Sequence, residues 1–134
     1  MKTKKVVIVA DGGCLNNGRP NAVAYYSFKV WIDGYDFDGC PIRYTPEYKT
    51  NQAAELNAAV CALSYVIALD LGQDDVTLKM DSMYAIGYAT GAFKLDPKAP
   101  NYELKVDLKK KVALYSNLKF EHIDNQVVKK ILGH

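Results

Sequence analysis

The chain of 134 residues is long enough for one domain with a single core, which we expect over residues 1–134, and it leaves no room for two. Its 49% hydrophobic and 24% charged residues are typical of a globular protein and exclude a disordered or fibrous chain. A formal net charge of +2 is too small to indicate a nucleic-acid-binding protein by itself.

The cysteines and the N-terminal residues indicate a cellular compartment. The three cysteines form no C-x-x-C pair, and their odd number argues against a disulfide framework and for a reducing environment. The first apolar run, Val6–Ala10, is too short for a secretion signal, and the sequence indicates no membrane span. We therefore expect a cytoplasmic protein.

The first third of the chain predicts an antiparallel meander. Val6–Ala10 is apolar throughout, as in a central strand that is covered on both faces. A loop is expected at 16–21, and the alternation in Ala24–Ile32 predicts a strand with two unlike faces. We expect a turn over 33–39 and a third strand over Cys40–Tyr44.

The remainder predicts helices that alternate with two further strands. Leu56, Val60 and Leu63 recur at helical spacing among many alanines, which predicts a helix from Thr50 to near Gly72. The other expected elements are a strand over Val76–Met80, a short helix over 83–90, a connector over 91–101, a helix over 102–115, a strand over Leu118–Ile123 and a last helix over Asn125–Leu132.

This order of elements predicts an α/β fold with a mixed five-stranded sheet. The first three strands form the antiparallel meander, and the fourth and fifth lie parallel to the first because helices connect them. Helices then cover both faces of the sheet.

The C-terminal third of the chain is basic. Residues 94–130 hold nine lysines against five acids. On the expected helix 102–115, Lys105 and Lys109 face away from the core. A solvated helix face and a phosphate-binding patch explain this composition equally well.

Acidic residues follow two of the expected parallel strands. A single acid such as Asp11 at the end of a strand is commonly a turn residue or a helix cap, so its partners decide its role. Asp81 ends the fourth strand, which is expected to neighbour the first, and adjacent strands lie roughly 5 Å apart. Glu55, early in the helix that joins them, could be directed at the same point.

Three gathered carboxylates repel one another unless cations neutralise them. Oxygen ligands favour hard ions such as Mg²⁺ or Mn²⁺, which bind substrate phosphates. The chemistry that fits Asp11, Glu55 and Asp81 is two-metal phosphodiester hydrolysis.

Three segments, "DGGCLNNG", "TNQAAELNAA" and "KMDSMYAI", resemble in order and spacing the three motifs of type 1 ribonuclease H. The resemblance covers nearly the whole chain, including the meander, and implies an RNase H-like fold. It implies a divalent-metal-dependent endonuclease that hydrolyses the RNA strand of RNA/DNA hybrids. The cofactor would be two Mg²⁺ or Mn²⁺ ions.

The resemblance also implies roles for single residues. Asp11, Glu55 and Asp81 would be catalytic metal ligands, with Asp11 bridging both ions. Thr50, with Lys49 beside it, matches a region that grips a DNA-strand phosphate, although Thr50 also reads as a helix cap. The residues expected to follow the minor groove of the hybrid are Gly12, Cys14, Asn17, Asn51 and Gln52. Cys14 is expected to pack or to offer backbone contacts, not to act as a nucleophile.

The last helix departs from the family's pattern. In "NQVVKKIL", Lys129 falls where the family has a fourth acid, and a cation beside two metal ions is unfavourable. Asp124 is the best substitute for this catalytic acid, and a solvated turn residue is the equal alternative. We expect hydrolysis that needs high metal concentrations and prefers Mn²⁺.

Two further features of the family are absent. There is no loop carrying a histidine before the last helix; His122 lies within the expected fifth strand as a surface or core residue, and His134 is the final residue. The connector 91–101 is too short for the basic helical handle of some relatives. Substrate grip would then depend on the lysines of 105–111, on another domain or on a partner.

Two other functions remain open on this sequence. A catalytically weak or inactive RNase H-like module that binds nucleic acid or protein would explain Lys129. Another nuclease of the same fold, such as a junction resolvase or transposase core, agrees less well with "TNQAAELNAA". Retention of all three acids favours the enzyme.

Overall fold

The computed structural model describes residues 3–133. Its elements in chain order are β1 (Lys5–Leu15), β2 (Val23–Ile32), β3 (Tyr35–Thr45), α1 (Asn51–Ala68), β4 (Asp75–Met80), α2 (Met83–Thr90), α3 (Tyr102–Val112), β5 (Asn117–His122) and α4 (Asn125–Leu132). None of the helices in this part of the chain is long and apolar enough to cross a membrane.

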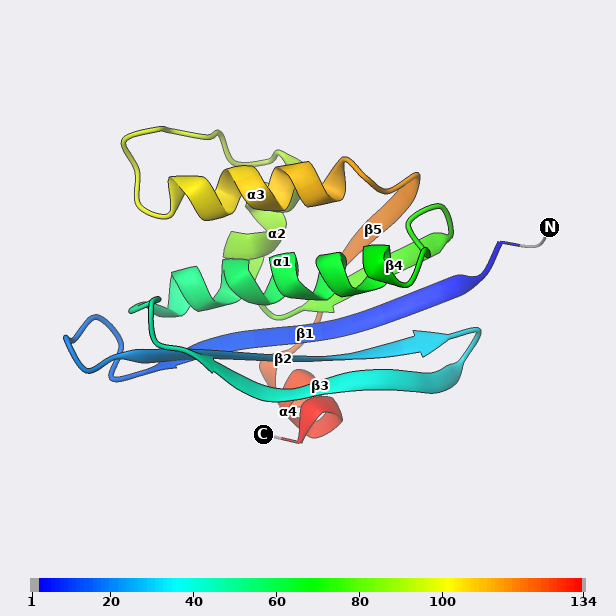
Figure 1. The fold of residues 1–134 in the computed structure, drawn as a ribbon, viewed down its shortest axis with the longest axis horizontal. Helices are drawn as coiled ribbons and strands as arrows, with labels where there is room; N and C mark the ends of the chain where they lie inside the picture. Colours follow the sequence, from blue (N-terminus) through cyan, green and yellow to red (C-terminus); the bar gives the residue numbers. More distant parts are fainter. Residues whose placement is uncertain (1–2, 134) are drawn as a thin grey trace.

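The strands form one mixed sheet in the order β3-β2-β1-β4-β5 (Figure 1). β1, β2 and β3 pair antiparallel, whereas β4 pairs parallel with both β1 and β5. The predicted fold class is therefore confirmed, including the meander and the parallel set. β1 lies at the centre of the sheet, next to the strand that follows the long helix.

Helices cover both faces of this sheet. α1, α2 and α3 lie on one side and α4 lies on the other (Figure 1). The core between α1 and the sheet includes Ile8, Leu56, Leu63 and Leu78, all of them fully buried. Burial of an aliphatic side chain of this size contributes roughly 1.5–3 kcal/mol, so this layer fixes α1 against β1.

The hairpin between β2 and β3 is tighter than the predicted turn over 33–39. Asp33 and Gly34 have positive φ values of 51° and 83°, as in the two-residue Asp-Gly turns that suit twisted hairpins. β3 therefore starts at Tyr35 and not at Cys40.

Helix ends also differ from the predictions. α1 ends at Ala68, before the predicted end near Gly72, because Asp70 takes a left-handed conformation with φ of 61°. α3 ends at Val112 and not at residue 115. β1 runs on to Leu15, past its predicted end, because it stays paired with β2.

Lys105 contradicts the prediction that it faces away from the core. Its side chain is buried, with the ammonium over the rings of Tyr88 at 4.2 Å and Tyr84 at 5.5 Å. Burial lowers the pKa of Lys105, but hydrogen bonds to the two tyrosines outweigh it and the pKa is raised. The aliphatic part of the Lys105 side chain packs between α2 and α3, and the two tyrosine rings face its ammonium. Lys109 is exposed, as predicted.

Candidate active site

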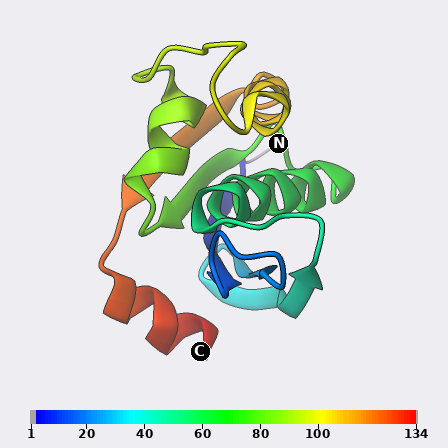
Figure 2. The ribbon, with the colours of Figure 1, turned by 90° about the vertical axis from the view of Figure 1, so that its left-hand side faces the viewer.

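The strands β1 and β4 separate at one end of the sheet, and a cleft lies there. Parallel pairing of these strands ends at Val9 and Lys79, whereas β1 continues to pair with β2 as far as Leu15. Asp11 lies just beyond the point of separation, and Asp81 directly follows β4. Figure 2 looks onto this end of the molecule, where the starts of α1 and α4 lie near the ends of these strands. Both acids thus lie at one edge of the sheet, as predicted.

Gly12 allows α1 to approach β1 closely. A Cβ atom at this position would lie 2.2 Å from the carbonyl oxygen of Ala54 and 3.0 Å from the backbone nitrogen of Glu55. Any side chain would therefore push the first turns of the helix off the strand. The glycine brings Glu55 to the same edge as Asp11.

The three acids line one cleft of about 490 Å³. β1 contributes Asp11, α1 contributes Glu55, and the β4–α2 junction contributes Asp81. Asn125 and Lys129 of α4 line it from the other face of the sheet. The carboxylates predicted to converge therefore do share one cleft.

Asp11 is the most perturbed of these acids. The residue is 7% exposed, and its pKa is raised to about 7, with burial as the largest cause. The charge of Asp81, a hydrogen bond between the two carboxyl groups and the charge of Glu55 contribute to this rise, and a backbone hydrogen bond from Gly12 opposes it. Burial and the neighbouring acids thus favour a protonated Asp11 up to near neutral pH.

Glu55 is fixed by a serine on the neighbouring helix. Ser82 donates its hydroxyl to Glu55 Oε2 at 2.8 Å and accepts from the backbone N–H of Ala85 at 3.0 Å, which caps α2. Burial raises the pKa of Glu55, and the Ser82 hydrogen bond offsets only part of this rise. The predicted helix over 83–90 gave no indication that the preceding Ser82 contacts Glu55.

Two residues from the end of the chain contact Asp81. The side-chain amide of Asn125 donates to Asp81 Oδ2, and His122 Nε2 lies 3.2 Å from the backbone carbonyl oxygen of Asp81. His122 is an exposed residue of β5, in agreement with the surface alternative. Only the proximity of strand ends could have suggested either contact.

The donor set fits a hard divalent cation. Asp11 and Asp81 share a hydrogen bond, so a cation could replace their proton. Glu55 turns to Ser82 instead, and among residues 3–133 no group of three His, Cys, Asp or Glu side chains is arranged to hold one ion. A bound ion would therefore rest mainly on Asp11 and Asp81, with Glu55 close by.

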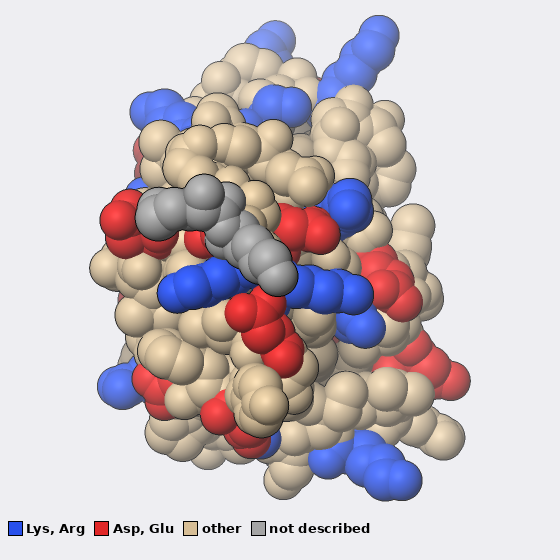
Figure 3. Space-filling model, turned by 90° about the vertical axis from the view of Figure 1, so that its right-hand side faces the viewer, with Lys and Arg blue, Asp and Glu red and all other residues tan. Residues whose placement is uncertain are grey.

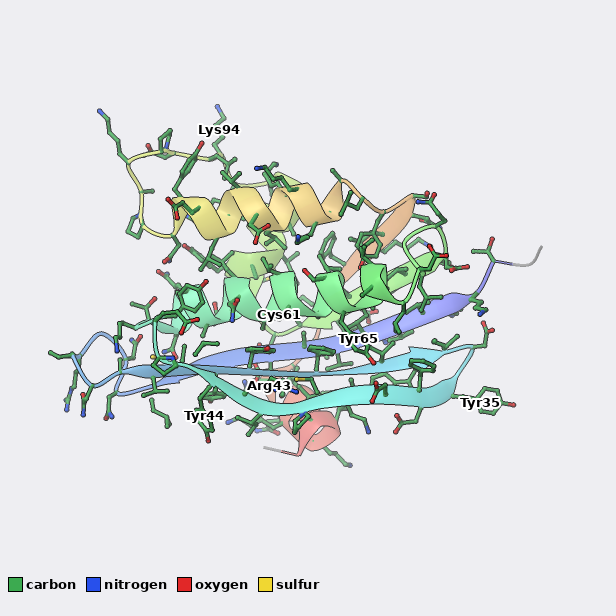
Figure 4. The ribbon with its side chains drawn as sticks, in the orientation of Figure 1. Tyr35, Arg43, Tyr44, Cys61, Tyr65 and Lys94 are labelled. Carbon is green, nitrogen blue, oxygen red and sulfur yellow. The ribbon has the colours of Figure 1, made fainter. Side chains whose placement is uncertain are left out.

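An aromatic wall borders the cleft on the meander side. A Cβ at Gly13 would lie 2.4 Å from Tyr25 Oη, so the absence of a side chain makes room for this hydroxyl. The Tyr25 ring meets that of Tyr44 edge-on at 6.4 Å, and Tyr44 projects from β3 on the face opposite α1 (Figure 4). Burial and then the charge of Asp11 raise the pKa of Tyr25. The sequence analysis did not identify this wall.

The predicted substrate-binding residues do not all lie in one place. Four of them line a shallow depression beside the start of α1, namely Asn17, Thr50, Asn51 and Gln52. Asn17 Oδ1 accepts from the backbone N–H of Asn51 at 2.8 Å, which joins the 16–22 loop to the helix. Gly12 lines the main cleft, whereas Cys14 is half-buried. Lys49 donates its ammonium to the carbonyl oxygen of Ala22 at 3.0 Å.

Thr50 caps α1, as the alternative interpretation predicted. Its hydroxyl accepts from the backbone N–H of Ala53 at 3.2 Å. Thr50 also lines the depression, so the capping residue lies beside the predicted substrate-binding amides.

Of the two residues that the sequence singled out at α4, Lys129 lines the cleft and Asp124 does not. The Asp124 carboxylate caps the helix by accepting from the backbone N–H of Gln126 at 3.0 Å, and it is not among the described residues that line the cleft. Lys129 does line it. His134 lies outside the described residues.

The end of the molecule opposite the cleft has a different surface. Figure 3 shows lysines and arginines interspersed with acids there. Lys119 pairs with Asp75 at 3.4 Å, and Lys111 pairs with Asp107 at 3.8 Å on α3. These two lysines of the C-terminal third are therefore already paired with acids, whereas Lys94 projects from the 91–101 connector beyond α3 (Figure 4).

A family model described as RNase H matches residues 3–134. The chain belongs to the RNase H family. No curated protein sequence matches it.

Solved structures share its fold. The N-terminal RNase H domain of Rv2228c from Mycobacterium tuberculosis superimposes with a TM-score of 0.77 at 23% identity, over 93% of this chain and 91% of that one. RNase H1 from Halobacterium salinarum gives 0.74 at 23% identity, over 93% and 89%. LC11-RNase H1 in complex with an RNA/DNA hybrid gives 0.71 at 23% identity, again over 93% and 89%. At this identity the likeness shows the RNase H fold.

Proposed function

We propose that this chain is a divalent-metal-dependent endoribonuclease that hydrolyses the RNA strand of RNA/DNA hybrids, with two Mg²⁺ or Mn²⁺ ions. The observation that carries the proposal is the single cleft lined by Asp11, Glu55 and Asp81 at the carboxyl edge of the sheet. Membership of the RNase H family supports it, as does the RNA/DNA hybrid bound by the structural neighbour LC11-RNase H1.

The carboxylates prepare the cleft for cations and a phosphate. Asp11 and Asp81 are the pair that would hold the ions, and Glu55, which accepts a hydrogen bond from Ser82, lines the same cleft. When bound, the ions would activate a water and stabilise the oxygen that leaves the scissile phosphorus. Asn125 occupies one oxygen of Asp81 and so fixes the orientation of that carboxylate.

The depression beside α1 suits the groove of a hybrid. Asn17, Asn51 and Gln52 present amide groups there, which donate to and accept from sugar hydroxyls. Contacts with 2′-hydroxyls distinguish RNA from DNA. We propose that these residues, with Gly12 and Cys14, follow the minor groove, and that Thr50 and Lys49 bind a DNA-strand phosphate.

The test is cleavage of a labelled RNA/DNA hybrid across Mg²⁺ and Mn²⁺ titrations, with duplex DNA and duplex RNA as controls. We expect cleavage of the hybrid alone, with a preference for Mn²⁺. Asp11→Asn should lower the rate at least about a hundredfold, because it removes a charge from the metal-holding pair.

The matched control is Glu103→Gln, which removes one exposed carboxylate on α3 outside this cleft. It should cleave as the parent protein does. Unchanged cleavage in Asp11→Asn would reject the assignment of the site, and absence of cleavage with either metal would reject the enzyme.

A binding module is the second candidate. Lys129 in the cleft favours it, because an ammonium there opposes metal binding. This candidate predicts that the protein binds the hybrid without cutting it in either metal. Gel-shift measurement of the uncut complex separates the two functions.

A further inference from the structure

Lys129 gives the cleft a positive charge of its own. It lines the same cleft as the carboxylates of Asp11, Glu55 and Asp81. It is an exposed residue and takes part in none of the ion pairs found among residues 3–133. Its ammonium is therefore not held by an acid elsewhere on the surface.

The helix itself directs Lys129 at the cleft. Val128 is fully buried and fixes the rotation of α4, and the amide of Asn125 is tied to Asp81. Lys129 follows Asn125 by four residues, so both side chains lie on one face of the helix. Lys130 comes from the next position, is exposed and does not line the cleft.

The charges in the cleft limit how many cations it can hold. When the three acids are ionised, they and one ammonium sum to −2. One divalent ion neutralises this charge, whereas two would leave +2 until a phosphate enters. Without the ammonium, the charge would be −3 and the second ion would meet a residual negative charge.

We propose that Lys129 acts as a resident cation of this cleft and weakens its binding of divalent ions, the second ion included. This inference rests on the proposed metal-dependent function and concerns the same cleft. The ammonium of Lys129 also offers a contact to the entering phosphate, because the lysine side chain is long and exposed.

The size of the effect follows from Coulomb's law. A unit charge about 6 Å from a divalent ion, with the screening of water, changes the affinity for that ion about tenfold. Replacing Lys129 by a neutral residue should therefore strengthen each binding step about tenfold. Reversal of the charge should strengthen it about a hundredfold.

The experiment is calorimetric titration of the folded, substrate-free protein with Mn²⁺ in the parent, Lys129→Gln and Lys129→Asp, each checked for folding by circular dichroism. We expect Mn²⁺ to bind more tightly at each step in Lys129→Gln than in the parent, and more tightly again in Lys129→Asp. Lys130→Gln and Lys130→Asp make the same charge changes outside the cleft and should bind Mn²⁺ as the parent does.

The outcomes separate this inference from the proposed function. Two ions bound with the same affinities in the parent and both Lys129 variants would overturn the inference and leave the metal site intact. Equal changes in the Lys129 and Lys130 variants would also overturn it, because they would reflect net charge only. No Mn²⁺ binding in any of these proteins would overturn the metal site itself, and this inference with it.

Discussion

The helices α1 and α4 reach one cleft from opposite faces of the sheet, and they are anchored very differently. α1 has 18 residues, ten of them buried, and its start is packed against β1 without an intervening side chain at Gly12. α4 has eight residues, of which only Val128 is buried. Apart from that contact, a carboxylate cap and the Asn125–Asp81 hydrogen bond hold its first turn.

Because the two helices are anchored differently, they can contribute differently to the cleft. The firmly packed α1 carries an acid, Glu55, whose position the core determines. The lightly packed α4 carries the exposed Lys129, whose long side chain can adjust its position. A rigid acidic wall suits ions that demand fixed oxygen ligands, and an adjustable basic wall suits a phosphate that arrives and leaves.

The largest expected effect comes from the charge on the acidic wall. The pKa of Asp11 is raised from 3.8 to about 7, so the folded protein binds this proton more tightly than the unfolded chain. Its stabilising contribution is present below about pH 4 and is lost as the pH rises towards about 7. Urea unfolding in a chelator should show a loss of up to about 4 kcal/mol in the parent relative to Asp11→Asn over that interval.

Divalent cations should reverse this loss. At pH 7.5, Mn²⁺ should raise the melting temperature of the parent and not that of Asp11→Asn, because the ion binds only the folded site with its ionised carboxylate. A constant difference in unfolding free energy between the two proteins at every pH would contradict the crowding of acids around Asp11.

The next largest effect should separate α1 from β1. Gly12→Ala puts a methyl group into the carbonyl of Ala54, so the helix must shift and the free energy of unfolding should fall by about 3 kcal/mol. Denaturant unfolding measures it, and hybrid cleavage should fall as well because Glu55 moves with the helix. Gly39→Ala is the control, since its new methyl would lie 3.2 Å from the Lys29 side chain and 3.3 Å from the carbonyl oxygen of Phe28, which requires only a small shift. A loss no larger than the control's would show that α1 does not depend on this contact.

A smaller effect should loosen α4. Val128→Ala removes two methyl groups from the one buried residue of this helix, at a cost of about 2 kcal/mol if the helix stays folded with the sheet. Hydrogen exchange should then show faster opening of α4 and unchanged protection of α1. Val127→Ala, at a neighbouring position that is 46% exposed, should change neither. Equal loss of protection in both helices would mean that the two walls unfold together.

The acids of the cleft were predictable because their positions follow from the strand pattern. An acid that ends an apolar run falls at the carboxyl edge of the sheet whatever the side-chain details, which holds for Asp11 and Asp81. The mixed sheet was predictable for the same reason, since helix-linked strands lie parallel. Turn and helix ends were less predictable. The Asp33-Gly34 pair does favour a two-residue turn, but the turn was expected over all of 33–39, and α1 ends at the left-handed Asp70, which local composition does not specify.

Contacts between distant residues were not predictable. Ser82 reaches Glu55 across 27 positions, and Tyr25 lies over Gly13 on the adjacent strand. The burial of Lys105 depends on two tyrosines of another helix. Such pairs depend on side-chain packing between elements, which hydrophobic periodicity does not encode.

The smallest expected effect tests the hydrogen bond that holds Glu55 on the rigid wall. Ser82→Ala removes the α2 cap and the donor to Glu55, so the free energy of unfolding should fall by about 1 kcal/mol. Because the Ser82 hydrogen bond lowers the pKa of Glu55, its loss should raise that pKa and move the acid limb of the cleavage profile to higher pH.

Ser82→Thr keeps a hydroxyl in place and should restore both the stability and the profile. A variant that loses stability while its pH profile stays unchanged would show that Ser82 only caps α2. In that case Glu55 would owe its orientation to the packing of α1 alone, and the firmness of this wall would come entirely from the contact at Gly12.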